Sequence, residues 1–277
     1  MYEAHYGLKE KAFRKTPDPR YLFLNDVYEE ALERLLFVVE EMDLALLTGE
    51  VGSGKTLLTR ALVDRVGDKY EIAMILNPRL SPRQFLHTLA GEIGIVTPRF
   101  HATDLQAQIH ERLLELDEAG RAALLIVDEA HLIPGKATFE EIRLLTNFQL
   151  DDRNLIAVVL VGQPELRVRL RHRAYRALTQ RIGAQFHLTP LDASDTHSYL
   201  RHRLTVAGAP RFLFDERAAL LLHQASGGLP RVLNQLATDA LIEGMARGVS
   251  EVGQEVVEAV IRGRDFLDEP VLHKAAV

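Results

Sequence analysis

The 277-residue sequence contains no cysteine and no tryptophan, and aromatic residues make up only 6% of it. The absence of cysteine excludes disulfide frameworks, thiol nucleophiles, iron–sulfur clusters and cysteine-bound zinc. Apolar runs such as Leu124–Val127 and Leu155–Val161 are far shorter than the roughly 18 residues of a membrane-spanning helix. The first 20 residues mix charges, proline and aromatics without an apolar segment, so we expect no secretory signal and a cytoplasmic location.

The proportions of charged and apolar residues indicate which classes of protein are compatible with the sequence. Lysine and arginine number 33 against 39 acidic residues, which gives a formal net charge of -6. This mild acidity argues against a protein that coats nucleic acid by bulk charge, although it is compatible with a local basic patch. Apolar residues make up 47% of the sequence, enough for the core of one large domain or two smaller ones.

Short apolar runs alternate with amphipathic stretches over the first two thirds of the chain. We expect strands at residues 44–48, 71–76, 122–127, 154–162 and 183–188, and helices at 55–66, from 82 onward, at 105–119 and at 139–148. Ser81 is the predicted N-cap of the second helix, with Pro82 in its first position, and Asp104 is the predicted N-cap of the third. Strands that alternate with helices indicate the α/β class, with a five-stranded, mostly parallel sheet flanked by helices.

The pattern changes after Thr189 and Pro190. Only helical periods follow, separated by glycine and proline turns, at residues 195–207, 216–225, 230–247 and 254–262. We therefore divide the chain into an α/β domain at 1–190, which includes an N-terminal arm at 1–25, and a small all-α domain at 191–264. Residues 265–277 show no periodicity, and we expect a loose tail there.

The stretch between the first expected strand and the next helix matches the pattern G-x-x-x-x-G-K-[ST] in full. Its residues, here called the phosphate loop, are Gly49, Glu50, Val51, Gly52, Ser53, Gly54, Lys55 and Thr56. Glycines let such a loop turn its backbone N–H groups toward phosphate oxygens, and the following helix N-terminus attracts the same anion. We expect Lys55 to reach the β- and γ-phosphates of ATP and the Thr56 hydroxyl to bind Mg²⁺.

Two carboxylates, Asp128 and Glu129, directly follow the strand expected at residues 122–127. Since parallel strands end at one edge of their sheet, these side chains are expected beside the phosphate loop. Asp128 is predicted to hold Mg²⁺, and Glu129 to act as the general base that deprotonates the attacking water. His131 completes a D-E-A-H string, but the other motifs of DEAH-box helicases are not apparent, and we assign it no role. The eleven histidines show no metal-binding spacing with nearby acids, so no metal other than Mg²⁺ is expected.

Further short strings extend from the first residue to about residue 240. They are MY at residues 1–2, YGL at 6–8, TPDPRYL at 16–22, LTGEVG at 47–52, ILNP at 75–78, GQPEL at 162–166, QRI at 180–182, PR at 230–231 and NQL at 234–236. With the phosphate loop, the acidic pair and the helical C-terminal region, they resemble the AAA+ ATPases. Within these the sequence is similar to the general secretion pathway protein A (ExeA-like) subgroup and the related pilus-biogenesis ATPases. The resemblance implies a P-loop AAA+ module followed by a helical lid at 191–264.

The resemblance also implies roles outside the two motifs. Gln163, after the fourth strand, matches the sensor of the attacking water or the γ-phosphate, unless it only caps the next helix. Arg231, at a helix start in the lid, matches a second γ-phosphate sensor, with a merely solvated arginine as the alternative. Asn77 follows the second strand, where a polar residue can hold the catalytic glutamate inactive until a partner binds, although Asn-Pro is also a plain turn. Tyr21, with Phe23, lies where the family builds its adenine pocket, and packing of the N-terminal arm is the alternative.

Six arginines lie between residues 167 and 181, here called the arginine-rich segment. In AAA+ rings this segment faces the ATP of the neighbouring subunit, and we predict Arg181, or in second place Arg176, as the arginine finger that completes that site. Alternate arginines point about 200° apart around a helix, so they cannot all face one ligand. The alternatives for the rest are solvation, partner contacts or a DNA-contacting strip.

The resemblance predicts an ATP hydrolase that forms a ring or dimer with ATP and drives assembly or remodelling of a type II secretion or type IV pilus machine. The alternative is an ATP-gated DNA-binding adaptor, such as a transposition regulator, because these proteins share the module. Members of the general secretion pathway protein A subgroup carry a membrane span and a peptidoglycan-binding region after the ATPase. Neither is visible in these 277 residues, so we do not expect direct binding to the cell wall.

Overall fold

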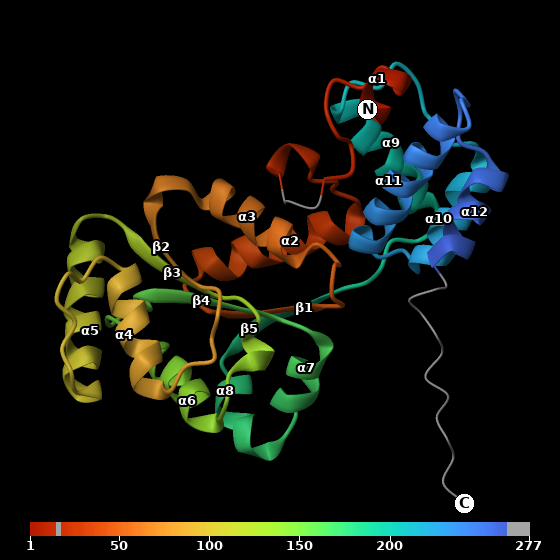
Figure 1. Ribbon diagram of the computed structural model, residues 1–277. Coiled ribbons are helices and arrows are strands. Elements are labelled where there is room, and N and C mark those ends of the chain that lie inside the picture. Colours follow the sequence, from red (N-terminus) through yellow and green to blue (C-terminus); the bar gives the residue numbers. More distant parts are fainter. Residues whose placement is uncertain (15–17, 265–277) are drawn as a thin grey trace, which may run out of the picture. The chain divides into compact units, whose positions relative to one another are not determined.

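The computed structural model describes residues 1–14 and 18–264, so the tail expected at 265–277 lies outside the described residues. The described chain forms two compact units (Figure 1). The sheet unit consists of Leu24–Val51 and Lys55–Thr189 and contains all five strands. The helical unit consists of Met1–Phe23, Gly52–Gly54 and the chain from Pro190 onward. The first 23 residues thus pack with the C-terminal helices, whereas the sequence analysis groups residues 1–25 with the α/β domain.

The sheet unit is built on parallel strands in the order β2-β3-β4-β1-β5, which confirms the predicted five-stranded parallel sheet. The strands are β1 Leu44–Gly49, β2 Tyr70–Ile75, β3 Ala122–Val127, β4 Ile156–Gly162 and β5 Ile182–Leu188. All residues of β1 and β4 are buried, as central strands covered on both faces require. The register sets Thr48 opposite Gly162 and Val127 opposite Leu160, so β1, β3 and β4 end at the same edge of the sheet.

Helices cover both faces of this sheet, with α2 and α3 on one face and α4 and α6 on the other (Figure 1). The helices of the unit are α2 Asp26–Glu40, α3 Lys55–Val66, α4 Pro82–Glu92, α5 Ala102–Glu118, α6 Lys136–Leu145, α7 Pro164–Leu170 and α8 Arg176–Thr179. Helix α2 is not among the elements expected from the sequence. It begins after Asn25, whose side chain accepts the N–H of Tyr28, and it packs against β5 and β1.

The first residues of three helices of the sheet unit can be compared with those expected from the sequence. Ser81 caps α4 as predicted and forms a full capping box with Gln84. The prediction of Asp104 as the N-cap of α5 is wrong. That helix begins at Ala102, and Asp104 lies inside its first turn, where a carboxylate favours the helix dipole. The next helix begins at Lys136, before the expected Phe139.

A single hydrophobic cluster joins the strands to α4, α5 and α6. Phe85, Leu89, Ile109 and Phe139, which these helices contribute to it, are at most 1% exposed. Burying each such side chain stabilises the fold by about 1.5–3 kcal/mol. This packing fixes the strand ends from which the candidate site residues project.

The helical unit combines N-terminal residues with the C-terminal helices. Its elements are α1 Tyr2–Tyr6, a 3-10 turn Pro19–Tyr21, α9 Ala193–Val206, α10 Glu216–Ser226, α11 Pro230–Ala246 and α12 Gln254–Arg264. Gly228, after α10, has φ of 72°, and a Cβ there would lie 2.0 Å from the carbonyl oxygen of Leu191, so this turn requires glycine. No helix within residues 1–14 and 18–264 is long and apolar enough to cross a membrane.

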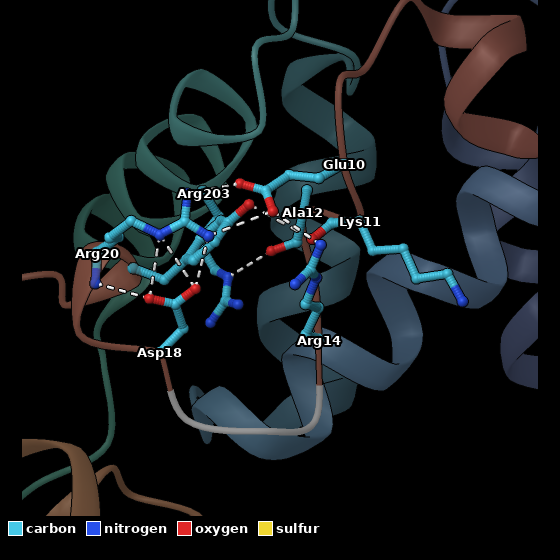
Figure 2. A network of polar contacts seen from close by, with 8 residues as sticks. Glu10, Lys11, Ala12, Arg14, Asp18, Arg20 and Arg203 are labelled. Atoms are coloured by element: carbon cyan, nitrogen blue, oxygen red, sulfur yellow. Dashed lines mark hydrogen bonds and ion pairs between the residues drawn. The ribbon is translucent and has the colours of Figure 1, made fainter.

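A buried arginine ties the N-terminal segment to α9 (Figure 2). Arg203 is 5% exposed, and its Nε donates to the carbonyl oxygen of Ala12 at 2.8 Å. A second guanidinium nitrogen donates to the Tyr199 hydroxyl at 2.9 Å, and the guanidinium carbon lies 4.6 Å from the centroid of the Tyr21 ring. Arg20 forms ion pairs with two acids of the same segment. These contacts explain why the N-terminal residues belong to the helical unit.

Candidate active site

The phosphate loop joins the end of β1 to the start of α3. Gly52 and Gly54 have φ of 84° and 93°, in the left-handed region that glycine enters readily. The ammonium of Lys55, only 7% exposed, donates to the carbonyl oxygens of Gly49 at 2.8 Å and Glu50 at 2.9 Å. The lysine is thus folded into the loop, and a bound phosphate would exchange these carbonyl contacts for phosphate oxygens.

Arg231, the predicted second sensor, is the second residue of α11 and belongs to the same compact unit as Gly52. Its backbone N–H donates to the Gly52 carbonyl oxygen at 3.2 Å, and a Cβ on that glycine would lie 2.5 Å from the arginine Cβ. This close approach requires glycine at position 52. The Arg231 residue is exposed, and its role toward the γ-phosphate stays a prediction. Of the other loop residues, Val51 and Thr56 are exposed and Ser53 is fully buried.

Asp128 follows β3 and is held by backbone hydrogen bonds. Its N–H donates to the carbonyl oxygen of Ile75 at 2.9 Å, and its Oδ1 accepts the N–H of Glu129 at 2.8 Å. Burial is the main influence on this carboxyl and raises its pKa above the ordinary value, while the Glu129 N–H and the charge of Lys55 act in the opposite direction. A partly buried carboxylate of this kind is stabilised by a nearby cation.

The oxygen donors of this site suit Mg²⁺. The predicted ligands, the Thr56 hydroxyl and the Asp128 carboxylate, are the hard oxygen donors that this ion prefers. Within residues 1–14 and 18–264, no group of three His, Asp or Glu side chains is placed to hold a metal by itself. Magnesium in nucleotide sites takes only one or two protein oxygens and completes its shell with phosphate and water, so the two donors are sufficient.

Glu129, the predicted general base, has φ of 50° and ψ of 35°, a left-handed backbone that is unusual for glutamate. It is the N-cap of the 3-10 turn Ala130–Leu132, and its carbonyl oxygen accepts the N–H of Leu132 at 2.8 Å. Its side chain is 43% exposed, although its Oε2 atom is covered. One carboxylate oxygen is thus enclosed while the rest of the side chain remains open to solvent, as a base for water requires.

His131, to which the sequence analysis assigns no role, lies between two predicted catalytic residues. Its Nδ1 is 3.3 Å from Oε2 of Glu129 and 3.4 Å from the backbone nitrogen of Gln163. Gln163 follows β4 and occupies the N-cap position of α7. Its side chain makes no capping hydrogen bond, so the alternative that it only caps this helix is not supported. The only sequence signal for His131 is its position, two residues after the base.

Asn77 is exposed beyond the end of β2, and its side-chain oxygen accepts the N–H of Arg79 at 3.4 Å. This contact is that of a turn. The inhibitory role of Asn77 toward the catalytic glutamate stays a prediction.

The arginine-rich segment is not one helix. It divides into α7, a 3-10 turn Arg173–Tyr175 and α8. Arg169 is used inside the unit: its Nε donates to the Tyr175 hydroxyl at 3.0 Å, and its guanidinium lies 4.9 Å from the Phe139 ring centroid. Arg181, the first choice for the finger, donates to Oδ1 of Asn147 at 2.7 Å from an exposed position.

The other four arginines line one cavity of about 570 Å³ in the sheet unit. We call it the arginine-lined cavity; its arginines are Arg167, Arg171, Arg173 and Arg176. Its apolar wall comes from Leu46, Leu170 and Ile182, and it has no acidic lining residue. Arg176, the second choice for the finger, belongs to this group. The cavity is suited to an anionic ligand.

Tyr21 is 1% exposed within the helical unit, and its ring lies against Arg203. Phe23 is half-buried and makes an edge contact with Tyr199, the ring centroids 5.8 Å apart. These contacts are those of an N-terminal arm that packs within the helical unit. The stacking of Tyr21 on adenine stays a prediction.

Comparison with known proteins agrees with this geometry. The AAA domain family matches residues 27–170. General secretion pathway protein A of Aeromonas hydrophila is 40% identical over 255 residues, which are 91% of this chain and 46% of that protein, so the chain spans about half the length of this relative.

Solved structures show the same fold. The ORC2 protein of Aeropyrum pernix has a TM-score of 0.69 at 18% identity, with 92% of this chain and 71% of that chain covered. The RuvB Holliday junction branch migration motor of Thermotoga maritima has a TM-score of 0.58 at 18% identity, with 92% and 73% covered. The family match confirms the fold class and the enzyme class that the sequence predicts. The chain therefore belongs to the AAA domain family and is a nucleotide-binding ATPase of the AAA type.

Proposed function

We propose that this ATPase uses ATP and Mg²⁺ to drive assembly or remodelling of a type II secretion or type IV pilus machine, acting in the cytoplasm where ATP is supplied. The support for this role is the 40% identity to a protein named General secretion pathway protein A. The support for the chemistry is the common edge of β1, β3 and β4, after which Lys55, Asp128, Glu129 and Gln163 follow.

The proposed mechanism assigns one task to each side chain. The loop N–H groups and Lys55 would bind the β- and γ-phosphates, and Thr56 and Asp128 would hold Mg²⁺, which would neutralise charge on the phosphates. Glu129 takes a proton from the attacking water through its solvent-facing oxygen. Gln163 orients that water or the γ-phosphate.

The test of the chemistry is Glu129→Gln, which removes the base and keeps its shape. We expect nucleotide affinity within a few-fold of the unaltered protein and turnover lower by at least about 10²-fold, measured by phosphate release and by binding of a fluorescent nucleotide. Near-normal hydrolysis would refute the assignment of Glu129. In the native host, the same variant should impair secretion or pilus formation even beside the unaltered protein, because it occupies the machine without turnover.

The alternative function, an ATP-gated DNA-binding adaptor, is favoured by one observation. The arginine-lined cavity gathers four guanidinium groups without a carboxylate, and phosphate backbones bind to such groups. We rank it second because net charge is -6 and only this region is strongly basic in sequence.

A further inference from the structure

The candidate base has a neighbour that the ATPase chemistry does not otherwise use. Oε2 of Glu129 is covered, and Nδ1 of His131 lies 3.3 Å from it. The two atoms lie at ion-pair distance, and Oε2 has no hydrogen-bond partner in the described part of the chain. Because burying a carboxylate oxygen without a donor is costly, a proton on Nδ1 of His131 would stabilise this position of the carboxylate.

His131 is itself held in place. Its side chain is 13% exposed, and it belongs to the 3-10 turn Ala130–Leu132 directly after the base. Arg169 donates to the carbonyl oxygen of His131 at 3.4 Å, and a further guanidinium hydrogen bond reaches Ile133. At Gly162, the last residue of β4, a Cβ would lie 3.4 Å from the backbone nitrogen of His131, so the 3-10 turn packs closely on this strand. These contacts fix the backbone that carries the imidazole beside the carboxylate.

The two contacts of Nδ1 demand different states of the ring. Donation to Glu129 requires a proton on Nδ1, whereas acceptance of the Gln163 N–H requires its lone pair. The Gln163 contact is the longer, at 3.4 Å, and involves a neutral backbone donor. The covered carboxylate oxygen has the larger need for a partner, since hydrogen bonds to charged groups are the stronger ones. The hydrogen bond that the structure shows at Nδ1 is the one from the Gln163 N–H, whereas the need of the covered carboxylate oxygen for a donor favours a proton on Nδ1, facing Glu129.

We propose that His131 is a positioning residue that holds one oxygen of the Glu129 carboxylate, so that the other oxygen is presented to the attacking water. This inference rests on the proposed role of Glu129 as general base. Residues that orient a reacting group act mainly on turnover, because misplacement by about 1 Å costs on the order of 10²-fold in rate. The covered position of Oε2 and its distance to His131 are the observations that favour one orientation of the carboxylate.

The experiment compares His131→Ala, His131→Asn and the control His87→Ala, an exposed histidine of α4. The Asn side-chain amide reaches about as far as Nδ1 and can donate to Glu129. We expect the alanine variant to lose on the order of 10²-fold in kcat with KM and nucleotide affinity nearly unchanged, the asparagine variant to recover most of that loss, and the control to match the unaltered protein. Circular dichroism and urea unfolding verify that each variant is folded.

A second arm places His131→Ala in the Glu129→Gln background, with single-turnover hydrolysis as the measurement. If the histidine acts through the glutamate, the double variant is no slower than Glu129→Gln alone. Full activity of His131→Ala, absence of rescue by asparagine, or a further loss in the double variant would each overturn the positioning role. Normal activity of Glu129→Gln would instead refute the proposed base, so the two failures are distinguishable.

Discussion

At the residue scale, buried ionisable side chains set how this protein responds to pH. His202 of α9 packs against Phe23, the ring centroids 5.8 Å apart, and its Nε2 is buried without a hydrogen-bond partner among the described residues. Burial, and next the charge of Arg203, lower its pKa below the ordinary value of 6.5, while a hydrogen bond with the backbone of Leu22 acts in the opposite direction. The folded state therefore favours the neutral ring.

The sign of the pH effect follows from this shift. The folded protein binds fewer protons at His202 than the unfolded chain, so the stability from the neutral ring is present above pH 6.5 and is lost as pH falls from there through the folded pKa. We predict that His202→Asn loses less stability between pH 7 and pH 5 than the unaltered protein, measured by urea unfolding. His101→Asn, at an exposed position, is the control. Identical pH slopes for His202→Asn and the unaltered protein would contradict the prediction. Part of the slope should remain, because burial also lowers the pKa of His187.

At the element scale, the arginine-lined cavity arises because the arginine-rich segment breaks into α7, a 3-10 turn and α8. If these arginines serve protein contacts, fluorescence anisotropy with duplex DNA should show only weak binding at physiological salt, in the range of about 10⁻⁴–10⁻⁶ M expected of non-specific contacts. ATP should not change it.

The matched variants are the triple change Arg171→Ala, Arg173→Ala and Arg176→Ala, and the single change Arg217→Ala at an exposed position of α10. A sub-micromolar affinity that needs ATP, falls steeply with salt and disappears only in the triple variant would favour the DNA-binding adaptor.

The elements that the sequence predicts well are those with strong local signals. The helix starting at Lys55 and the strand ending at Val127 are predicted to the residue, because a glycine turn and an acidic pair mark their ends. Helix α2 is not predicted, although Asn25 caps it and Tyr28, Leu32 and Leu35 form its buried side. An N-cap residue and apolar residues at helical spacing are a signal from which this helix could have been predicted.

Other features have no local signal. Helical geometry predicts that alternate arginines diverge, and only the breaks between α7 and α8 gather four of them around one cavity. The left-handed backbone of Glu129 is likewise unexpected, because glutamate rarely adopts it. The contact of His131 with the base depends on this backbone, so the sequence alone could not assign it a role.

At the scale of the whole molecule, we propose that a second copy completes the site, because none of the site residues assigned to this chain is expected to place a second cation on the open side of the γ-phosphate. An arginine finger from a neighbouring copy is worth about 10³–10⁵ in rate, and Arg181 or Arg176 is the proposed donor. Turnover per chain should therefore rise with protein concentration as a ring or dimer forms. Arg181→Ala should keep nucleotide affinity and lose this rise.

Mixing Arg181→Ala with Lys55→Ala tests the geometry. One variant contributes the intact phosphate loop and the other the intact arginine, so mixed interfaces should recover part of the activity, measured by phosphate release. Turnover that is independent of concentration, together with a mixture no more active than its components, would refute the site completed by a second copy. The same experiment with Arg176→Ala decides between the two arginines.

The left-handed backbone of Glu129 has a consequence for attempts to engineer this protein. A side chain in that conformation costs about 1–2 kcal/mol relative to the right-handed region, and glycine or asparagine there would relieve much of the cost. A selection for heat resistance alone would therefore reward replacements at position 129 that abolish the proposed base. Thermostable variants of this enzyme should be selected for stability and ATP hydrolysis together, because at position 129 thermal stability favours glycine or asparagine and the proposed catalysis requires glutamate.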